Sequence, residues 1–361
     1  ARERSGADVV VAVMSGHYVQ RGEPALTDKW RRAEMALRHG VDVVIELPFP
    51  LACNSAPLFG RGAVEILNAF APALDSLCFG SEQGDLEPLQ ALARDWQEQP
   101  SDEADVSHIR QGKTFPQARG EFGSASAIAD QPNTILGVSY LRALDDLNST
   151  IKPLTIQRQG HGYHDAGLDG DGFASATAIR QQLLQGYSVA GLVPDAAEAL
   201  LNDARRAGMV VDEAGGVAML AQAAVTAGSY QELVDAIKAR HLTRTRVQRI
   251  LCHLLSGADD ALIEQLMHWG TPYLTLLGAT PRGEAFLSQT RKSMDRPVLG
   301  NLSRISVRLR QFYAGQPEKL ALAQRLVAVE DRMTRLYTLL LPGWRGESRQ
   351  WNYYQDALRI S

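Results

Sequence analysis

Apolar runs and amphipathic stretches alternate along the first half of the chain. The short apolar runs predict buried strands at residues 8–14, 41–47 and 76–79. Apolar positions at helical spacing predict helices between them, at residues 29–39 and 59–70. Thr27 or Asp28 is placed to cap the first of these helices, and Gly40 to end it. Strands that alternate with helices of this length predict right-handed crossovers and a parallel sheet.

The pattern changes after the third strand. Residues 97–131 are polar and contain Pro, Gly, Ser and Asp throughout, which predicts a long surface excursion. An amphipathic helix over Asn133–Leu147 and a strand over Leu154–Arg158 follow it, and Gln159–Gly172 has the composition of a loop. The next helix begins after Ser175, a favourable N-cap residue.

Helical periodicity dominates from Pro194 to the end of the chain, and strand signals nearly vanish. A chain of 361 residues is long for one core, so two domains are expected. We place the boundary near residue 190. The predicted fold is α/β, with a parallel-sheet domain over residues 1–190 and a mainly α-helical domain over residues 191–361.

Composition excludes several classes of protein. The chain is 45% hydrophobic and 22% charged, as ordinary globular proteins are. No apolar run approaches the roughly 20 residues that cross a bilayer, and no signal-peptide pattern opens the chain. Three widely spaced cysteines give neither a disulfide framework nor a CxxC metal site, which favours the reducing cytoplasm.

The net charge of −4 gives no global basic field, but basic residues cluster locally. Seven basic residues stand against two acidic ones between Arg282 and Arg310. A second cluster runs from Lys238 to Arg249. Such stripes are expected where a protein contacts phosphate backbones. A solvated helix face is the simpler interpretation of the same pattern.

Polar residues follow the predicted strands, where ligands bind in open parallel sheets. These segments are Ser15-Gly16-His17, Glu46-Leu47-Pro48, Gly80-Ser81-Glu82 and Arg158. The helix start from Ser175 to Arg180 offers free backbone N–H groups and a cation to a phosphate, or else is an ordinary N-cap beside a surface arginine.

Other chemistries have little support in the sequence. The loop at residues 160–165 has two histidines and an acid, but no third ligand at metal-site spacing is evident, so no metal site is expected. GxSxG, Walker A and HExxH motifs do not occur.

Longer stretches resemble one family. They are MSGHYVQRGEPALTDKWRRAEMAL from Met14, GVDVVIELP from Gly40, FGSEQGD from Phe79, PNTILGVSYLRAL from Pro132, IKPLTIQRQGHGYHD from Ile151, FASATAIR from Phe173, HLTRTRVQRILCHLL from His241 and YLTLLGATPRGEAFL from Tyr273. They occur in order over most of the chain and resemble tRNA(Met) cytidine acetate ligase, a family of the nucleotidyltransferase superfamily with a Rossmann-like ATP domain.

The resemblance implies a two-step reaction. Acetate attacks the α-phosphate of ATP to give acetyl-adenylate and pyrophosphate. The N4 amine of the wobble cytidine, position 34 of elongator tRNA(Met), then takes the acetyl group and becomes N4-acetylcytidine. ATP, accompanied by Mg²⁺, is the implied co-substrate. Acetate and elongator tRNA(Met) are the implied partners, without a membrane or an obligate protein partner.

The resemblance also implies roles for individual residues. The residues that it places at ATP are Gly80, Asn133, Arg158, Ser175, Thr177 and Arg180. Ser175, Thr177 and Arg180 match the Ser/Thr-x-x-Arg phosphate element of the superfamily. The residues that it places at tRNA are Arg244, Arg246 and Arg249.

One departure from the family pattern concerns catalysis. The family opens with a strand and an HxGH motif whose histidines stabilise the reacting phosphates, and this sequence contains no HxGH. We expect the chain to be a fragment that begins after that motif, and its catalytic residues stay unassigned. The alternatives are another nucleotidyltransferase with a small acceptor, and a non-catalytic tRNA-binding relative. Arginine clusters in the second half argue against a small acceptor.

Overall fold

The computed structural model describes residues 1–98, 131–158, 174–211, 234, 243–343 and 351–360. Its central sheet contains β1 (Val11–Ser15), β4 (Val43–Leu47), β7 (Leu274–Ala279), β8 (Val298–Leu299) and β9 (Leu358–Arg359). β1 runs parallel to β4, and β7 runs antiparallel to β4. β8 and β9 both pair in parallel with β7.

Two smaller sheets accompany the central one. β5 (Ser76–Ser81) and β6 (Lys152–Gln157) pair in parallel. β2 (Tyr18–Val19) and β3 (Glu23–Pro24) form an antiparallel pair. Among the described strands, β1 pairs only with β4 and β5 only with β6, so each has one edge without a strand partner.

The sequence predicted that the first strand is buried, and this prediction was wrong for β1. All five of its residues are only half-buried, whereas all five residues of β4 are buried. The difference follows from pairing, because β4 lies between β1 and β7 while one edge of β1 has no described neighbour.

Most described residues lie in helices, several of which begin at the predicted caps. Asp28 accepts the N–H of Arg31 at 2.9 Å to start α2, and Ser175 accepts the N–H of Ala178 at 3.1 Å to start α9. The helices are α1 (Arg2–Ser5), α2 (Lys29–Arg38), α3 (Phe49–Ala52), α4 (Ala56–Asn68), α5 (Leu86–Glu98), α8 (Pro132–Asp146), α9 (Ala176–Leu184), α10 (Asp195–Arg206), α13 (Arg244–Ser256), α14 (Asp260–Trp269), α15 (Pro281–Thr290), α16 (Ile305–Phe312), α17 (Pro317–Thr338) and α18 (Trp351–Tyr354).

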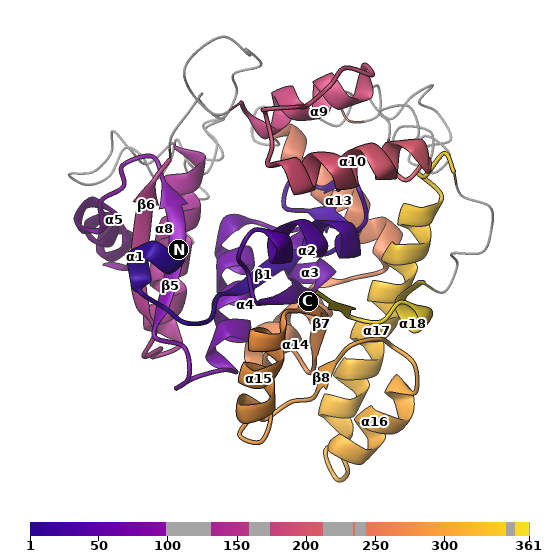
Figure 1. Ribbon diagram of the computed structural model, residues 1–361. Helices are drawn as coiled ribbons and strands as arrows, with labels where there is room; N and C mark the ends of the chain where they lie inside the picture. The colour runs from indigo at the N-terminus through magenta and orange to yellow at the C-terminus, as the bar shows by residue number, and fades with distance from the viewer. Residues whose placement is uncertain (99–130, 159–173, 212–233, 235–242, 344–350, 361) are drawn as a thin grey trace.

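Figure 1 shows β5, β6, α5 and α8 together on one side of the molecule and α16 and α17 on the other. The helices α4 and α8 pack against each other and join the small parallel sheet to the central one. Val11 and Val13 of β1 and Leu77 of β5 pack against the same apolar cluster, which α4 and α8 provide.

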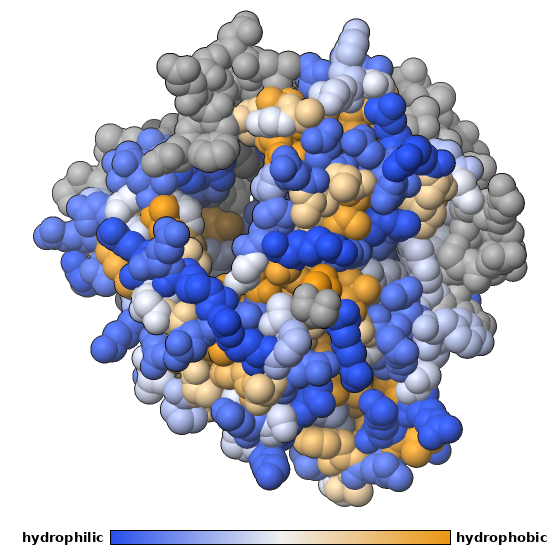
Figure 2. Space-filling model, in the orientation of Figure 1, coloured by the Kyte–Doolittle hydropathy of each residue, from blue (hydrophilic) through white to orange (hydrophobic). Residues whose placement is uncertain are grey.

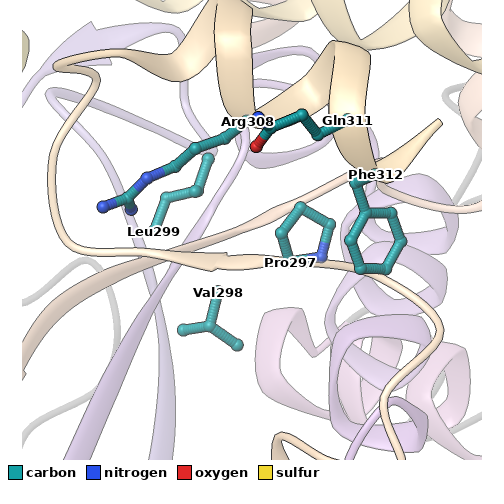
Figure 3. A pocket seen from close by; sticks show the side chains of 6 residues that line it. All are labelled: Pro297, Val298, Leu299, Arg308, Gln311 and Phe312. Atoms are coloured by element: carbon teal, nitrogen blue, oxygen red, sulfur yellow. The ribbon is translucent and has the colours of Figure 1, made fainter. Parts of the chain in front are cut away.

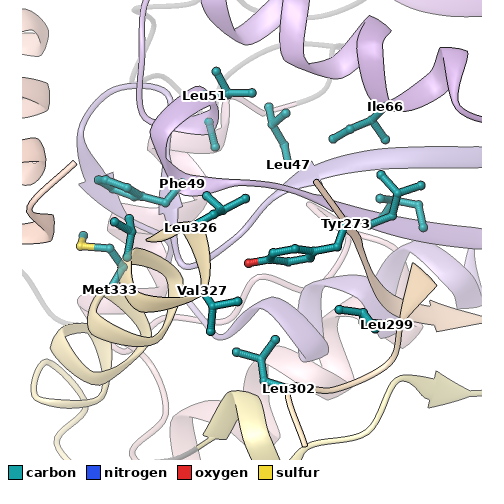
Figure 4. Close-up of a cluster of buried hydrophobic side chains, with 14 of the residues drawn as sticks. Leu47, Phe49, Leu51, Ile66, Tyr273, Leu299, Leu302, Leu326, Val327 and Met333 are labelled. Carbon is teal, nitrogen blue, oxygen red and sulfur yellow. The ribbon is translucent and has the colours of Figure 1, made fainter. Parts of the chain in front are cut away.

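The largest hydrophobic core draws on both halves of the chain. Leu47, Phe49 and Ile66 come from the first half, and Leu326 and Met333 of α17 come from the second. Figure 4 shows these side chains directed toward one another. Their burial against one another is the main apolar contribution that holds the central sheet against α17.

The mixed α/β fold class is confirmed, but the second half of the chain is not wholly helical. β7, β8 and β9 lie in it, and β7 pairs with β4 from the first half. A short apolar run such as Leu274–Ala279 cannot be distinguished from a buried helix by periodicity alone. The functional division near residue 190 stays a prediction.

Candidate functional site

The turn after β5 is fixed to β6 by side-chain hydrogen bonds. Ser81 Oγ accepts the N–H of Gly84 at 2.9 Å and lies 2.8 Å from Thr155 Oγ1. Gly84 has a φ of +70°, and a Cβ there would collide with Gln157. The turn therefore requires glycine at this position, and it holds Glu82 in one place.

Glu82 closes the first turn of α8. Its Oε1 accepts both the backbone N–H of Asn133 at 3.0 Å and the side-chain amide of Asn133 at 2.7 Å. Its Oε2 accepts the hydroxyl of Thr134 at 3.1 Å. Burial would raise the pKa of Glu82, but these hydrogen bonds outweigh burial and hold the pKa below its ordinary value. An ionised carboxylate at this position also suits the positive end of the helix dipole.

Arg158 stands at the carboxyl end of β6. Its backbone N–H donates to the Ser81 carbonyl at 2.9 Å, and its Nη1 donates to Asn133 Oδ1 at 3.1 Å. The side chain is exposed, and a guanidinium has five N–H donors, so most of its donors can reach a ligand. A Cβ on the neighbouring Gly80 would lie 3.4 Å from Arg158 Cγ, an ordinary contact. The structure thus brings together Gly80, Asn133 and Arg158, three of the six residues that the resemblance places at ATP, and their role there stays a prediction.

Close packing of α8 on β5 places Asn133 at this corner. A Cβ on Gly137 would lie only 2.8 Å from the ring of Phe79, so glycine lets the helix approach the strand. Phe79 is buried and its ring centroid lies 5.5 Å from that of Tyr140. The position of Asn133 is therefore set by the apolar contact one turn further along α8.

A hollow of ≈ 480 Å³ opens beside this corner, within the range of about 300–1,000 Å³ that is common for small-ligand sites. Gly84 and Gln157 line it, one or two residues from Glu82 and Arg158. Glu3 and Arg4 of α1 also line it and carry opposite charges.

The predicted phosphate element lies on α9. Ser175 is the N-cap, and Thr177 follows inside the helix, but its side chain lies outside the described residues. Arg180 is half-buried, and its charge opposes the rise in the pKa of Tyr337 that burial causes.

The ends of β1 and β4 are occupied by a buried ion pair. Lys29 Nζ lies 2.7 Å from Glu46 Oε2, and both side chains are buried. A Cβ on Gly16 would collide with Glu46, so glycine is needed where the chain leaves β1. The charged groups at these two strand ends pair with each other and are not available to a ligand. The sequence predicted one ligand crevice formed by the ends of four strands, and the ends of β1 and β4 do not contribute free side chains to it.

His17 follows this turn and is also buried. Its Nδ1 lies 3.2 Å from Thr334 Oγ1, and its ring stacks on Tyr337 with centroids 4.4 Å apart. Burial, and then the charges of Lys29 and Arg32, lower its pKa well below the ordinary value. The imidazole is therefore neutral and belongs to the core between the sheet and α17.

The three arginines expected at tRNA lie on α13 but differ in environment. Arg244 and Arg246 are exposed at the start of the helix. Arg249 is half-buried, donates to the Asn54 carbonyl at 3.3 Å, and has its pKa lowered first by burial. Arg249 therefore also fastens α13 to the segment between α3 and α4.

A family model, described as HIGH Nucleotidyl Transferase, matches residues 1–214 and 213–350. The tRNA(Met) cytidine acetate ligase of Syntrophotalea carbinolica is 44% identical over 394 aligned positions, which cover 100% of this chain and 94% of that protein. The ligase of the same name from Caldicellulosiruptor saccharolyticus is 34% identical and covers 87% of this chain and 88% of its own length. The chain belongs to the tRNA(Met) cytidine acetate ligase family.

Solved structures agree with this family. The apo structure of Thermotoga maritima TmcAL superposes with a TM-score of 0.88 at 28% identity and covers 99% of this chain and 94% of that one. A second structure of that protein, bound with alpha-thio ATP, gives a TM-score of 0.86 at 28% identity, over 100% of this chain and 94% of that one. The ligase fold predicted from the sequence is therefore confirmed.

No described helix is long and apolar enough to cross a membrane. Within the described residues, no three His, Cys, Asp or Glu side chains gather as a metal site would require. The loop with His161 and His164 lies outside the described residues.

The sequence places Glu82 of this ligase in a strand-end segment where ligands bind, but it assigns the residue no role. FGSEQGD was singled out as a motif, but the partner of its carboxylate lies 51 residues further along the chain. The signal available in the sequence was an acid directly after a strand. Only the fold shows that this acid orients Asn133.

Proposed function

We propose that the chain is an ATP-dependent ligase that activates acetate as acetyl-adenylate and acetylates N4 of cytidine 34 in elongator tRNA(Met). The exposed Arg158 guanidinium, held beside Asn133 at the end of β6, carries this proposal. A free carboxylate is a poor electrophile. Transfer of the adenylyl group to acetate gives a mixed anhydride, and AMP is a good leaving group from it.

In the first step, an acetate oxygen bonds to the α-phosphorus of ATP while the bond to the bridging oxygen breaks and pyrophosphate leaves. Arg158 stabilises the phosphate charge, and Asn133 donates to the nucleotide. Exposed Gly80 leaves space for the nucleotide beside the strand. The free N–H groups at the start of α9, with Ser175, Thr177 and Arg180, bind phosphate oxygens.

Mg²⁺ enters with the ATP phosphates. The carboxylate nearest to Asn133 is Glu82, and both of its oxygens already accept hydrogen bonds. It therefore suits an orienting role better than direct metal binding. Mg²⁺ would neutralise charge on the phosphate oxygens.

In the second step, the cytidine N4 attacks the acetyl carbonyl, AMP departs, and N4 loses one proton. Arg244, Arg246 and Arg249 on α13 bind the phosphates of the tRNA. ATP and tRNA are both available in the cytoplasm, where we place the reaction.

The test uses the protein expressed together with the HxGH-bearing opening segment that the family resemblance predicts, and supplies it with ATP, Mg²⁺, isotopically labelled acetate and an elongator tRNA(Met) transcript. Digestion and mass spectrometry should find labelled N4-acetylcytidine at position 34, with one pyrophosphate released per acetyl group. A transcript with uridine at position 34 is the control. Transfer to that control, or acetylation that needs no ATP, would contradict the proposal.

A further inference from the structure

A groove lies between the edge strand β8 and α16, at the end of the molecule away from Arg158. It has a volume of ≈ 370 Å³, and its lining residues are Pro297, Val298, Leu299, Arg308, Gln311 and Phe312. Figure 3 shows the Phe312 ring beside Pro297, and Arg308 extended alongside Leu299. Figure 1 places α16 on the opposite side of the molecule from β5, β6 and α8.

The side chain of Phe312 in this groove is partly exposed to solvent. Phe312 is 43% exposed, whereas the adjacent Tyr313 is buried and donates its hydroxyl to the Pro272 carbonyl at 2.7 Å. Val307, also on α16, is 51% exposed. Figure 2 shows apolar and strongly hydrophilic surface side by side at this end of the molecule. An aromatic ring held at the surface by a buried neighbour is a ready platform for a flat ligand.

The charges around this platform have one sign. Arg304, Arg308 and Arg310 are exposed, and no acidic residue lines the groove. The nearest acid along the chain, Asp295, is paired with Arg296 at 2.7 Å. Among the described residues, Arg308 and Arg304 have no salt-bridge partner. The groove therefore combines a flat apolar surface with uncompensated positive charge.

This combination argues against a second copy of the chain as the occupant. A two-fold interface would place the arginines of one copy against those of the other, and like charges across an interface are unfavourable. An anionic ligand with flat apolar faces satisfies both features. Nucleotides have this chemistry, since every base offers a π-face and every linkage offers a phosphate.

We propose that the groove between β8 and α16 holds an unpaired nucleotide of the RNA substrate, with its base on Phe312 and its phosphate on Arg308. The Gln311 amide lies in the same groove and can hydrogen-bond the base edge. This inference rests on the proposed function in one respect, which is that the RNA is elongator tRNA(Met). Because α16 lies far from Arg158, the contact provides affinity and register and takes no part in chemistry.

The test replaces Phe312 and measures binding of an elongator tRNA(Met) transcript without ATP or acetate. Phe312→Ala should weaken binding roughly 5- to 100-fold, as loss of one base stack does. Phe312→Trp should bind as well as the parent, and Phe312→Leu should bind as poorly as the alanine variant. Tyr354→Ala, at another exposed aromatic position, is the matched control and should not change binding. Parent-like binding by Phe312→Leu would overturn the proposal, because an apolar protein partner tolerates leucine and a stacked base does not.

A second measurement tests the phosphate contact. Arg308→Gln should reduce the salt dependence of binding by about one phosphate contact, a change in slope near 0.7 for single-stranded RNA. An oligouridylate with 4-thiouridine should crosslink to the peptide that contains Phe312. Crosslinking to a different peptide would overturn the proposal. So would binding of polyglutamate or of phosphatidylserine vesicles that is as strong as RNA binding and depends equally on Arg308. Crosslinking at Phe312 without acetylation of any tRNA would leave this inference standing and remove the proposed function.

Discussion

Single side chains set the geometry of the proposed ATP site. Glu82 accepts three hydrogen bonds from the first turn of α8. Asn133, which donates two of them, in turn accepts a hydrogen bond from Arg158. These contacts orient the guanidinium in advance for the ATP that we propose it binds. Orientation in advance lowers the entropy lost when a ligand binds.

Arg158→Ala should weaken ATP binding by about 1.5–3 kcal/mol, because it removes charge-assisted hydrogen bonds to phosphate. Isothermal titration with ATP measures this change. Arg205→Ala on α10, another exposed arginine, is the matched control and should bind ATP as the parent does. Unchanged affinity in a folded Arg158→Ala protein would remove this residue from the site.

A second residue-scale prediction concerns stability and pH. Burial, and then the charge of Glu46, raise the pKa of Glu330 to about 8 from the ordinary value of 4.5. The stability that protonated Glu330 contributes is complete below pH 4.5 and is lost as the pH rises through 8. This loss has a slope of up to about 1.4 kcal/mol per pH unit.

Glu330→Gln should therefore remove this decline between pH 5 and 8. Its amide oxygen can still accept the Phe49 N–H, which lies 2.5 Å from Glu330 Oε1. Urea unfolding across this pH range is the measurement, and Glu264→Gln, at an exposed position on α14, is the control. A glutamine variant whose stability falls as steeply as that of the parent would show that another group titrates.

At the scale of elements, α13 combines an exposed start, which we propose contacts tRNA, with an anchored middle. Arg244 and Arg246 are exposed, while Arg249 bonds the Asn54 carbonyl. The backbone of α13 also packs closely against Gly22, which limits movement of the helix. A Cβ on Gly22 would lie 2.5 Å from the backbone nitrogen of Arg249. The arginines of one motif therefore have separable effects.

The double variant Arg244→Ala with Arg246→Ala should flatten the salt dependence of tRNA binding by about two phosphate contacts and leave stability nearly unchanged. Arg249→Ala should in addition lower the free energy of unfolding by about 1–2 kcal/mol, because the Asn54 carbonyl loses a charged donor. Filter binding over a salt series and urea unfolding distinguish these effects. Identical salt slopes for parent and double variant would mean that the two exposed arginines are only a solvated face.

Elements with local signals could be predicted from the sequence. The caps at Asp28 and Ser175 lie within three residues of the N–H groups that they accept, so residue type and spacing were sufficient. β7 could not be predicted, because its apolar run is short and its partner β4 lies more than 200 residues earlier. For the same reason the contact of Glu82 with Asn133 could not be predicted. The family resemblance grouped Gly80, Asn133 and Arg158, which lie together in the structure, but their role at ATP stays a prediction.

At the scale of the whole molecule, the core joins the two halves that the sequence analysis separated. β4 lies between β1 from the first half and β7 from the second. Tyr273, directly before β7, is fully buried in the shared cluster. The first 190 residues therefore lack part of their own sheet and much of the apolar surface that covers it.

Residues 1–190 expressed alone should consequently fail to unfold cooperatively, because β4 would lose one of its two neighbours and Leu47 and Phe49 would lose their cover. Near-ultraviolet circular dichroism and thermal unfolding, compared with the 361-residue chain, are the measurements. A sharp transition with native aromatic signals from the fragment would instead support an autonomous domain.

The unpaired edge of β1 has a consequence for how the protein behaves in solution. Its backbone N–H and C=O groups have no strand partner on that side among the described residues, and its five side chains are half-buried. Such an edge is a template for strand addition from another chain. For the 361-residue chain, association should therefore rise with concentration, and its onset in light scattering would set the working limit for solution experiments on this chain.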